Sequence, residues 1–463
     1  MSQTTINNNQ THAWQHADNK HHLHPFTVHA ELRKSGPRII THANGVFLYD
    51  SEGNKFLDGM AGLWCVQVGY SNQALIEAAT EALENLPYYN TFFQTSHPYV
   101  AELSEKIAAL TPGSLNQMVF ANSGSEANDT GVKLIRYYWN LKNKPNKKII
   151  LTRELGYHGV TLASASMAGL ESMHPQFDLP LPGFEHVQPA PHWYGFGRDK
   201  TPQEFSDICI EALEDKIKDL GAENIAAFCG EPVMGAGGMM IPPPDYWPRV
   251  EDLCRRHNIL LWSDEVICGF GRTGQWFGCQ TYQFTPDIMT VAKGLSSGYQ
   301  PISATILNAE VAGVIAESSE EMAHGFTYSG HPVTSAVALA NIRQLEELGL
   351  ITSPSAQTRR DYFQKRLASL ADHELVGETR GVGMLGAVEI VSSKKTHERF
   401  HKDQQAGRVC RDHCIEAGII VRAVGDTMVM SPPLIISEDE IDELIGKTRI
   451  ALDNTAKELE TID

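Results

Sequence analysis

The sequence lacks the marks of a secreted or membrane-spanning protein. Its eight cysteines form no CxxC pair and are scattered along the chain, which indicates free thiols in a reducing compartment rather than a disulfide framework. The first residues, "MSQTTINNNQ", contain no apolar core, so they predict no signal peptide. No apolar run approaches the roughly 20 residues that a membrane span needs. We therefore expect a cytoplasmic protein with no membrane partner.

Positive charge is also scarce. Lysine and arginine number 38 against 56 aspartates and glutamates, and the formal net charge is −18. A polyanion such as DNA would be repelled on average, and no stretch of the chain gathers into a basic patch. The sequence thus predicts no nucleic-acid partner, although a small anion can still bind at a local site.

Convincing sets of metal ligands are missing as well. Cys410 and Cys414 flank His413, but no second ligand pair lies nearby, so one face of a buried helix is the simpler interpretation. Residues 1–24 form a polar, His-rich stretch that we expect to be an arm rather than a core element. Its histidines, around "HHLHPF", have no cysteine or acidic ligand beside them. The sequence predicts no metal site.

What the chain does contain is an alternation of short apolar runs and helical stretches. The stretch "RIITHANGVFLYDSEGNKFLDGMAG", with its Asn-Gly and Glu-Gly-Asn turns, predicts a small antiparallel meander over 38–62. Helical spacing follows over 73–86. From about 115 to 305, runs of strand type alternate with helices, which predicts right-handed βαβ units and a mostly parallel sheet. Residues 335–375 are expected to be helical, and the remainder to form an α+β domain.

Five of these apolar runs lead directly into polar residues. "QMVFA" is followed by "NSGSEAN", "KKIIL" by "TRELGYHG", "IAAFCG" by "EPVMGAGG", "ILLWS" by "DEVICGFGRTG", and "DIMTVA" by Lys293. In open parallel sheets, ligands bind beyond the carboxyl ends of the strands. We therefore expect these polar residues to converge on one edge of the sheet and to form the functional site.

The stretch "NSGSEANDTGVKLIRYYW" predicts a seat for a phosphate group. Gly124 lets the backbone approach a ligand closely, Ser123 and Ser125 supply hydroxyls, and a helix begins at about Ser125. The first amides of a helix are unpaired and its dipole is positive at that end, so an anion is favoured there. The apolar stripe of this helix comprises Val132, Ile135 and Trp139. The alternative is an ordinary serine N-cap without a ligand.

Three further strand ends supply complementary chemistry. Asp264 ends an apolar strand, where a carboxylate needs a cationic or hydrogen-bonding partner, and Tyr157 offers an aromatic face. Taken singly, Asp264 could be a turn residue, Tyr157 a core residue and Lys293 an exposed strand end. Together with the phosphate seat they suit pyridoxal 5′-phosphate. Its aldehyde forms a Schiff base with lysine, its ring nitrogen pairs with a carboxylate, and its ring stacks on an aromatic side chain.

With these residues in view, the sequence resembles the class III (omega) aminotransferases over almost its whole length. The matching motifs are "NSGSEAND", "YHG", "EPVMGAGG", "DEVICGFGRTG", "AKGLSSGYQP", "GFTYSGHP" and "VRAVGDTMVMSPPL". The resemblance implies an α/β fold, the PLP-dependent transferase fold type I. It further implies a large PLP-binding domain over 76–340 and a small α+β domain built from both chain ends. That domain would comprise 341–463 and part of 1–75, the latter also holding the arm.

The resemblance also assigns roles around the cofactor. Lys293 would bind pyridoxal 5′-phosphate covalently, remove the substrate's α-proton and return it to the cofactor, while Asp264 would contact the pyridine nitrogen. Tyr157 and Val266 would cover the two faces of the ring. Thr327 would reach the phosphate from a partner subunit, which implies a homodimer with active sites at the interface, or a tetramer. The other expected cofactor contacts are Ser123, Gly124, Ser125, His158 and Glu231.

The resemblance is strongest to the branch that uses pyruvate as amino acceptor. It implies a ping-pong reaction that converts an omega-amine, a diamine or an omega-amino acid to an aldehyde or ketone and pyruvate to L-alanine. Arg422 matches an arginine that pairs with a substrate carboxylate and swings away for an uncharged amine; the alternative is a surface ion pair. Ile267 replaces the Gln that follows "DEV" in ornithine-type relatives, which argues against an ornithine or 4-aminobutyrate enzyme. The residues expected to shape the substrate pocket are Trp64, Phe92, Phe93, Tyr157 and Ala236.

Two rival functions stay open at this stage. An aminomutase or racemase would use the same cofactor but would need no keto acid. A cofactor-binding regulator would need a DNA-binding segment, for which the acidic composition and polar N-terminus give no support. The sequence does not single out the amine donor among putrescine, β-alanine and related amines.

Overall fold

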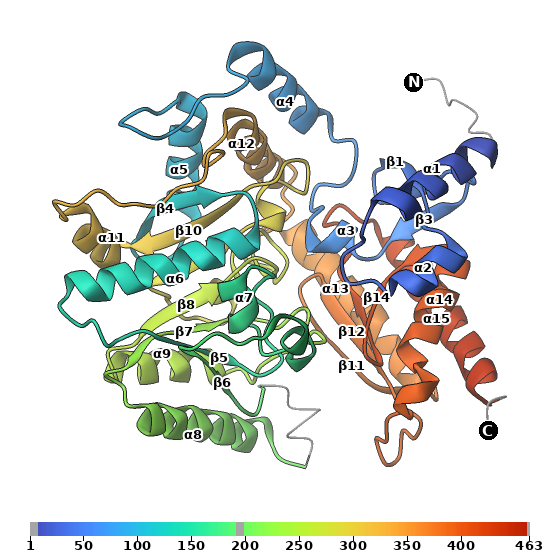
Figure 1. The fold of residues 1–463 in the computed structure, drawn as a ribbon. Coiled ribbons are helices and arrows are strands. Elements are labelled where there is room, and N and C mark those ends of the chain that lie inside the picture. The colour runs from blue at the N-terminus through green and yellow to red at the C-terminus, as the bar shows by residue number, and fades with distance from the viewer. Residues whose placement is uncertain (1–7, 191–198, 461–463) are drawn as a thin grey trace.

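The computed structural model describes residues 8–190 and 199–460, and its centre is a seven-stranded sheet (Figure 1). The order across the sheet is β4-β10-β9-β8-β7-β5-β6. Only β10 runs antiparallel to its neighbours, and the other six strands share one direction. The strands are β4 (Leu115–Ala121), β5 (Ile149–Arg153), β6 (Phe184–Val187), β7 (Ile225–Gly230), β8 (Leu260–Asp264), β9 (Ile288–Val291) and β10 (Ser303–Asn308). The prediction of a mostly parallel sheet is confirmed.

Both faces of this sheet are buried, which explains why its strands are continuous apolar runs. Successive residues along a strand point to opposite faces. Trp262 accordingly packs in a cluster with the helix α6 (Gly124–Leu141), whereas its neighbour Leu261 packs in the cluster that holds Phe205 and Trp247. The other helices of this part of the chain are α4 (Gln73–Asn85), α5 (Pro98–Leu110), α7 (Leu162–Met167), α8 (Pro202–Leu220), α9 (Tyr246–Arg256), α10 (Gly278–Thr281), α11 (Ala309–Ala316) and α12 (Pro332–Glu347).

The two ends of the chain build two smaller sheets side by side (Figure 1). One sheet has the order β1-β2-β3-β13 and the other β11-β12-β15-β14. β13 pairs in parallel with β3, so Ile419 lies opposite Leu57. The strands are β1 (Ile40–Asn44), β2 (Phe47–Asp50), β3 (Lys55–Asp58), β11 (Val376–Val382), β12 (Leu385–Ile390), β13 (Ile419–Ile420), β14 (Arg422–Val424) and β15 (Thr427–Met430). The fold class is therefore as expected, whereas the boundaries at 75 and 340 stay predictions.

Helices cover these smaller sheets and connect them to the large one. The C-terminal helices are α13 (Pro354–Ala368), α14 (Ala406–Glu416) and α15 (Glu438–Glu460), and the short helix α3 (Ala61–Trp64) leads from β3 towards the large sheet (Figure 1). Cys410 and Cys414 are buried on α14, as the helix-face interpretation predicted. Short 3₁₀ turns occur at Glu171–Met173, Pro175–Phe177, Lys293–Leu295, Ser369–Asp372 and Lys402–Gln404.

The N-terminal stretch is helical where the structure describes it. It forms α1 (Asn8–His21) and α2 (His29–Ser35), and Thr11 is buried although most of its neighbours are exposed. Residues 1–7 of the expected arm lie outside the described residues. Among the described residues, no helix combines the length and the apolar composition that a membrane crossing requires.

Candidate active site

The carboxyl ends of β4, β5, β7, β8 and β9 meet at one edge of the large sheet, because these five strands run in the same direction. Asp264 is the last residue of β8 and is 2% exposed. Its Oδ2 accepts hydrogen bonds from His158 Nδ1 at 2.7 Å and from Asn128 Nδ2 at 2.9 Å. Its Oδ1 accepts one from the amide of Val266 at 3.1 Å. Three donors therefore hold this buried carboxyl group in one orientation.

The phosphate seat predicted at the end of β4 is the N-terminus of α6. Ser123 caps the helix by accepting a hydrogen bond from the amide of Glu126 at 3.2 Å. Within the described part of the chain, no group accepts a hydrogen bond from the amides of Gly124 and Ser125. Ser125 Oγ accepts from the amide of Val160 at 3.0 Å, which ties the seat to the loop after β5. Two free amides at the positive end of an 18-residue helix are suited to an anion.

Glycines keep the backbone close around this seat. A Cβ on Gly124 would lie 3.1 Å from Val266 Cγ1, and one on Gly159 would lie 2.5 Å from Ser125 Oγ. Gly159 also has a φ of 135°, a backbone conformation that residues other than glycine rarely adopt. Val266 and the two glycines thus form a narrow cradle between the helix N-terminus and the end of β8.

Lys293 follows β9 after one residue and has a φ of 42°, in the left-handed region. This turn of the backbone ends the strand and directs the chain into a 3₁₀ turn. Nζ of Lys293 lies 5.6 Å from the centroid of the Trp64 ring and makes no hydrogen bond or ion pair with any described residue. Burial is the main cause that lowers the pKa of Lys293, and Arg422 lowers it further. The amine is therefore available for chemistry.

Arg422 approaches the same tryptophan. Its Cζ lies 5.1 Å from the centroid of the Trp64 ring, so the indole contacts both cationic side chains. Trp64 is 1% exposed and its indole N–H has no acceptor among the described residues. No carboxylate of the described chain forms an ion pair with Arg422, which leaves the guanidinium free for an anionic ligand. The alternative interpretation of Arg422 as a surface ion pair is therefore wrong.

The polar residues after β5 and β7 hold each other in place. Glu231 accepts hydrogen bonds from the amide of Tyr157 through Oε1 and from the amide of Gly235 through Oε2, both at 3.0 Å. Burial raises the pKa of Glu231 and also that of Tyr157. The charge of Arg422 acts in the opposite direction and lowers the pKa of Tyr157, which indicates that the two side chains are close enough to interact. Ala236 follows in the same loop and is buried.

The remaining predicted residues lie in a separate group, of which Phe93 and Thr327 are exposed and Phe92 is half-buried. Phe92 and Phe93 are 5.8 Å apart between ring centroids, and a Cβ on Gly325 would meet the Phe92 ring at 2.9 Å. Phe93 is 84% exposed, and Thr327, also exposed, accepts a hydrogen bond from Tyr88 Oη through its carbonyl at 2.8 Å. No hydrogen bond joins Thr327 to Lys293 or Asp264 among the described residues. Likewise, no ring contact joins Phe92 or Phe93 to Trp64 among the described residues.

One residue of the site was not predicted from the sequence. Asn128 lies on α6 and donates from Nδ2 both to Asp264 Oδ2 at 2.9 Å and to the carbonyl of His158 at 2.6 Å. It therefore links the helix, the loop after β5 and the end of β8. A signal was present, because Asn128 lies four residues before Val132 and so falls on the apolar stripe of the helix, where a polar residue needs a partner.

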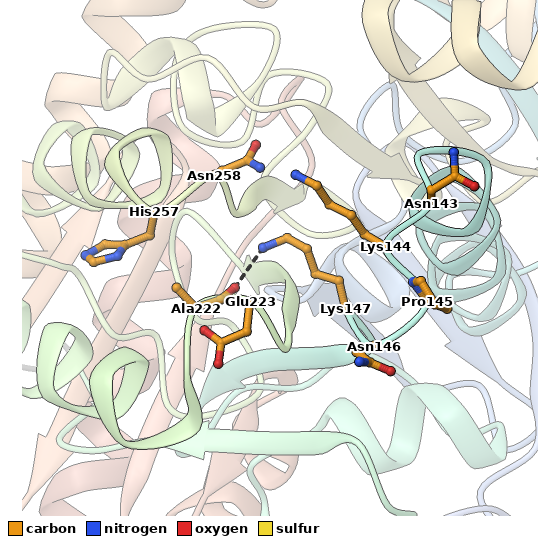
Figure 2. Close-up of a pocket in the computed structure, with 9 residues that line it drawn as sticks. All are labelled: Asn143, Lys144, Pro145, Asn146, Lys147, Ala222, Glu223, His257 and Asn258. Carbon is orange, nitrogen blue, oxygen red and sulfur yellow. Dashed lines mark hydrogen bonds between the residues drawn. The ribbon is translucent and has the colours of Figure 1, made fainter.

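A separate cavity of about 450 Å³ lies at the opposite edge of the sheet (Figure 2). It is lined by loops that precede β5, β7 and β8, so it is remote from the strand ends that hold Asp264 and Lys293. Lys147 donates from Nζ to the carbonyl of Ala222 at 2.8 Å and lies 4.8 Å from the Trp139 ring centroid. The Lys147 amine therefore already has partners within the protein. We assign this cavity no part in the active site.

Comparison with known proteins identifies the family. The family model Aminotransferase class-III matches residues 30–452. The chain belongs to the class III aminotransferases. It is 51% identical to the putrescine–pyruvate aminotransferase of Pseudomonas aeruginosa, an alignment that covers 97% of this chain and 98% of that protein. It is 41% identical to the chloroplastic gamma aminobutyrate transaminase 3 of Solanum lycopersicum over 95% of this chain and 85% of that protein.

Solved structures agree with this assignment. The omega transaminase of Pseudomonas jessenii in complex with PMP superposes with a TM-score of 0.93 at 44% identity, over 96% of this chain and 98% of that chain. An (S)-enantioselective omega-transaminase from Thermomicrobium roseum gives a TM-score of 0.93 at 41% identity, over 96% and 98%. Pyridoxal 5′-phosphate is the cofactor of this class III aminotransferase. The predicted preference against 4-aminobutyrate, based on Ile267, stays a prediction.

The residues present fit this cofactor. The free amides of Gly124 and Ser125 suit its phosphate, and the buried carboxylate of Asp264 suits its protonated ring nitrogen. Lys293 offers an amine without a hydrogen-bond partner among the described residues, and the Val266 side chain lies beside Gly124 at the phosphate seat. The individual roles of these residues stay predictions.

Proposed function

We propose that this aminotransferase moves the amino group of an omega-amine, a diamine or an omega-amino acid, such as putrescine or β-alanine, to pyruvate. The products are an aldehyde or ketone and L-alanine, and the two substrates use the site in turn. The observation that carries the proposal is the arrangement of Lys293 and Arg422 around Trp64, at 5.6 Å and 5.1 Å from the ring centroid. It offers an amine for chemistry and a cation for the carboxylate of pyruvate. The similarity to a putrescine–pyruvate aminotransferase supports the same assignment.

Lys293 is the group that moves the proton. Bound pyridoxal 5′-phosphate supplies an electron sink for the electrons that a departing proton leaves behind. Nζ of Lys293 takes the proton from the substrate carbon that carries the amino group, and later returns it. Burial lowers the pKa of Lys293. Near neutral pH, a larger fraction of its amine is therefore uncharged, and able to accept a proton, than in an exposed lysine.

The other side chains orient the reactants. Asp264, fixed by three hydrogen bonds, keeps a negative charge where the ring nitrogen binds. Arg422 binds the carboxylate of pyruvate through its planar fork, and this interaction is absent when a diamine occupies the site. Trp64 forms an apolar wall beside both groups and excludes water from the reacting carbon. One pocket can therefore accept two substrates that differ in charge.

The proposal includes a homodimer, with the tetramer as an alternative assembly. Thr327, Phe92 and Phe93 lie in a group that also contains Tyr88. Tyr88 is 40% exposed and Phe93 is 84% exposed, whereas Phe92 is half-buried. Exposed aromatic residues in one group are typical of a surface that another protein covers. In the proposed dimer, Thr327 of one chain completes the phosphate seat of the other, and Phe92 and Phe93 complete its substrate pocket.

The proposed compartment is the cytoplasm. All eight cysteines are free thiols, and seven of them are buried, as expected for a protein that folds under reducing conditions.

A half-reaction experiment tests the proposed function. The holoenzyme is mixed with putrescine, β-alanine or another amine in the absence of any keto acid, and pyridoxamine phosphate is measured by chromatography. We expect one equivalent per active site, followed by one equivalent of alanine after pyruvate is added. An isomerised amine without pyridoxamine phosphate would indicate an aminomutase or racemase instead. If no amine produces pyridoxamine phosphate, the proposed function is wrong.

A further inference from the structure

Three potential metal ligands converge where α1 ends. Asp18 lies on the last turn of α1, His22 follows four residues later, and His24 folds back towards the helix. One ligand atom from each residue lies within 4.8 Å of the other two. In the described part of the chain, no other group of three such side chains meets this criterion. The sequence prediction of no acidic ligand beside the histidines is therefore wrong, because Asp18 lies next to both.

The carboxylate of Asp18 stands between the two imidazoles. His24 Nε2 lies 2.6 Å from Asp18 Oδ2, and His22 Nδ1 lies 3.1 Å from Asp18 Oδ1. The two imidazole rings are 4.3 Å apart between centroids and tilted by 40°. Both carboxylate oxygens are thus directed at ring nitrogens that could ligate a metal after losing a proton.

The surroundings of the cluster leave room for further ligands. The side chains are 58% exposed for His22, 24% for His24 and 21% for Asp18, so water can reach the centre of the group. A site with three protein ligands needs water or another small ligand at its remaining positions.

We propose that Asp18, His22 and His24 bind one divalent transition-metal ion. Two imidazoles with one carboxylate suit Zn²⁺, Ni²⁺ or Cu²⁺, whereas Mg²⁺ and Ca²⁺ prefer sites made entirely of oxygen. The ion displaces the protons shared between the imidazoles and the carboxylate, and water fills its open positions. It links the last turn of α1 to the segment that leads to α2, so it stabilises the connection between these two helices.

Calorimetric titration of the metal-free holoenzyme with Zn²⁺ tests the proposal, after excess cofactor and reductant have been removed. We expect saturable binding of one equivalent per chain. Asp18→Asn and His24→Ala should each weaken that binding by more than about tenfold, the scale seen even for groups that only support a metal ligand. Unchanged affinity in both variants would overturn the proposal.

A matched control is available on the same helix. His12 and His16 are also four residues apart and exposed, but they lie outside the cluster. The double variant His12→Ala/His16→Ala should keep the Zn²⁺ equivalent; its loss would place the binding elsewhere in the His-rich stretch. Electron paramagnetic resonance of bound Cu²⁺ gives a second readout. It should show two ligating nitrogens in the unmodified enzyme and one in His24→Ala, and an unchanged spectrum would contradict the assignment.

Discussion

His158 Nδ1 lies 2.7 Å from Asp264 Oδ2, and both side chains are buried. Because an ionised carboxylate can only accept, the ring nitrogen must carry the proton, which fixes the tautomer of a neutral His158. Asn128 donates to the same oxygen, so two side chains from different elements orient one carboxylate. This arrangement keeps the Asp264 carboxylate in a fixed position at a site that is buried from water.

Replacing Asp264 by Asn should inactivate the enzyme without unfolding it. The amide is similar in shape but has no charge for the cofactor's ring nitrogen, and its NH₂ group would face a donor. We expect kcat/KM to fall on the order of 10²–10³-fold, the scale of removing one electrostatic group from an active site. Stopped-flow measurement of the half-reaction checks this.

His158→Gln provides the matched comparison for Asp264→Asn. Glutamine retains an N–H donor for the carboxylate, so the loss in kcat/KM should be smaller, about 10- to 100-fold, as for other residues that position a functional group. If His158→Gln were as inactive as Asp264→Asn, His158 would have a direct role in addition to the hydrogen bond.

The sequence predicted the catalytic edge because a charged or polar residue follows directly after each apolar strand there. The run "ILLWS" is buried on both faces, so the charged residue that follows it, Asp264, marks the end of the strand. The same logic failed for β6, whose sequence "FEHV" places Glu185 and His186 in a strand at the edge of the sheet. An edge strand has one unpaired side and tolerates polar residues, so it lacks the continuous apolar run.

Two other features could not be predicted from periodicity. The helix α1 has the sequence "NNQTHAWQHADNKH", which is polar on all sides, so no apolar stripe reveals it. The group of Phe92, Phe93 and Thr327 depends on contacts between segments more than 200 residues apart. One is the hydrogen bond from Tyr88 Oη to the carbonyl of Thr327, across a separation of 239 residues. Such contacts follow from the completed fold, and no local pattern encodes them.

Replacing Arg422 by Leu should impair the reaction with pyruvate far more than the reaction with the amine. The guanidinium has no ion-pair partner in the described chain, so its removal leaves no buried carboxylate unpaired. We expect kcat/KM for pyruvate to fall by about 30-fold or more, equivalent to the roughly 2–5 kcal/mol of a buried charge-assisted contact. The rate of the half-reaction with putrescine should change less than about threefold. Equal losses for the amine and for pyruvate would show that Arg422 supports the fold of the site rather than the carboxylate.

Two inactive variants should restore activity to one another if Thr327 acts across the dimer. Thr327→Glu repels the phosphate of the partner site, and Lys293→Ala removes the reactive amine. In a mixed dimer, one site keeps its own Lys293 and receives Thr327 from the other chain. We expect up to half of the wild-type activity per mixed dimer after the two variants are unfolded and refolded together.

The control for this experiment pairs Lys293→Ala with Asp264→Asn. Lys293 and Asp264 lie at the ends of the neighbouring strands β9 and β8 of one chain, so neither site of that mixed dimer is complete. No activity should return. Recovery in this control, or none with Thr327→Glu, would contradict a phosphate seat shared between subunits.

Lys147 predicts a pH dependence of stability that is independent of catalysis. It is 3% exposed beside the cavity of Figure 2, and burial, aided by Lys144, lowers its pKa to about 8 from 10.5. Between these two pH values the folded protein has released the proton that the unfolded chain still binds, so stability rises with pH in that window. Lys147→Met removes this contribution. Relative to the variant, the wild type should gain on the order of 2 kcal/mol in free energy of unfolding between about pH 7 and about pH 9.5, measured by urea denaturation.

Lys142→Met, at an exposed lysine of the same loop, should show no such difference. A wild type and Lys147→Met that respond identically to pH would mean that the Lys147 amine keeps its proton in the folded state.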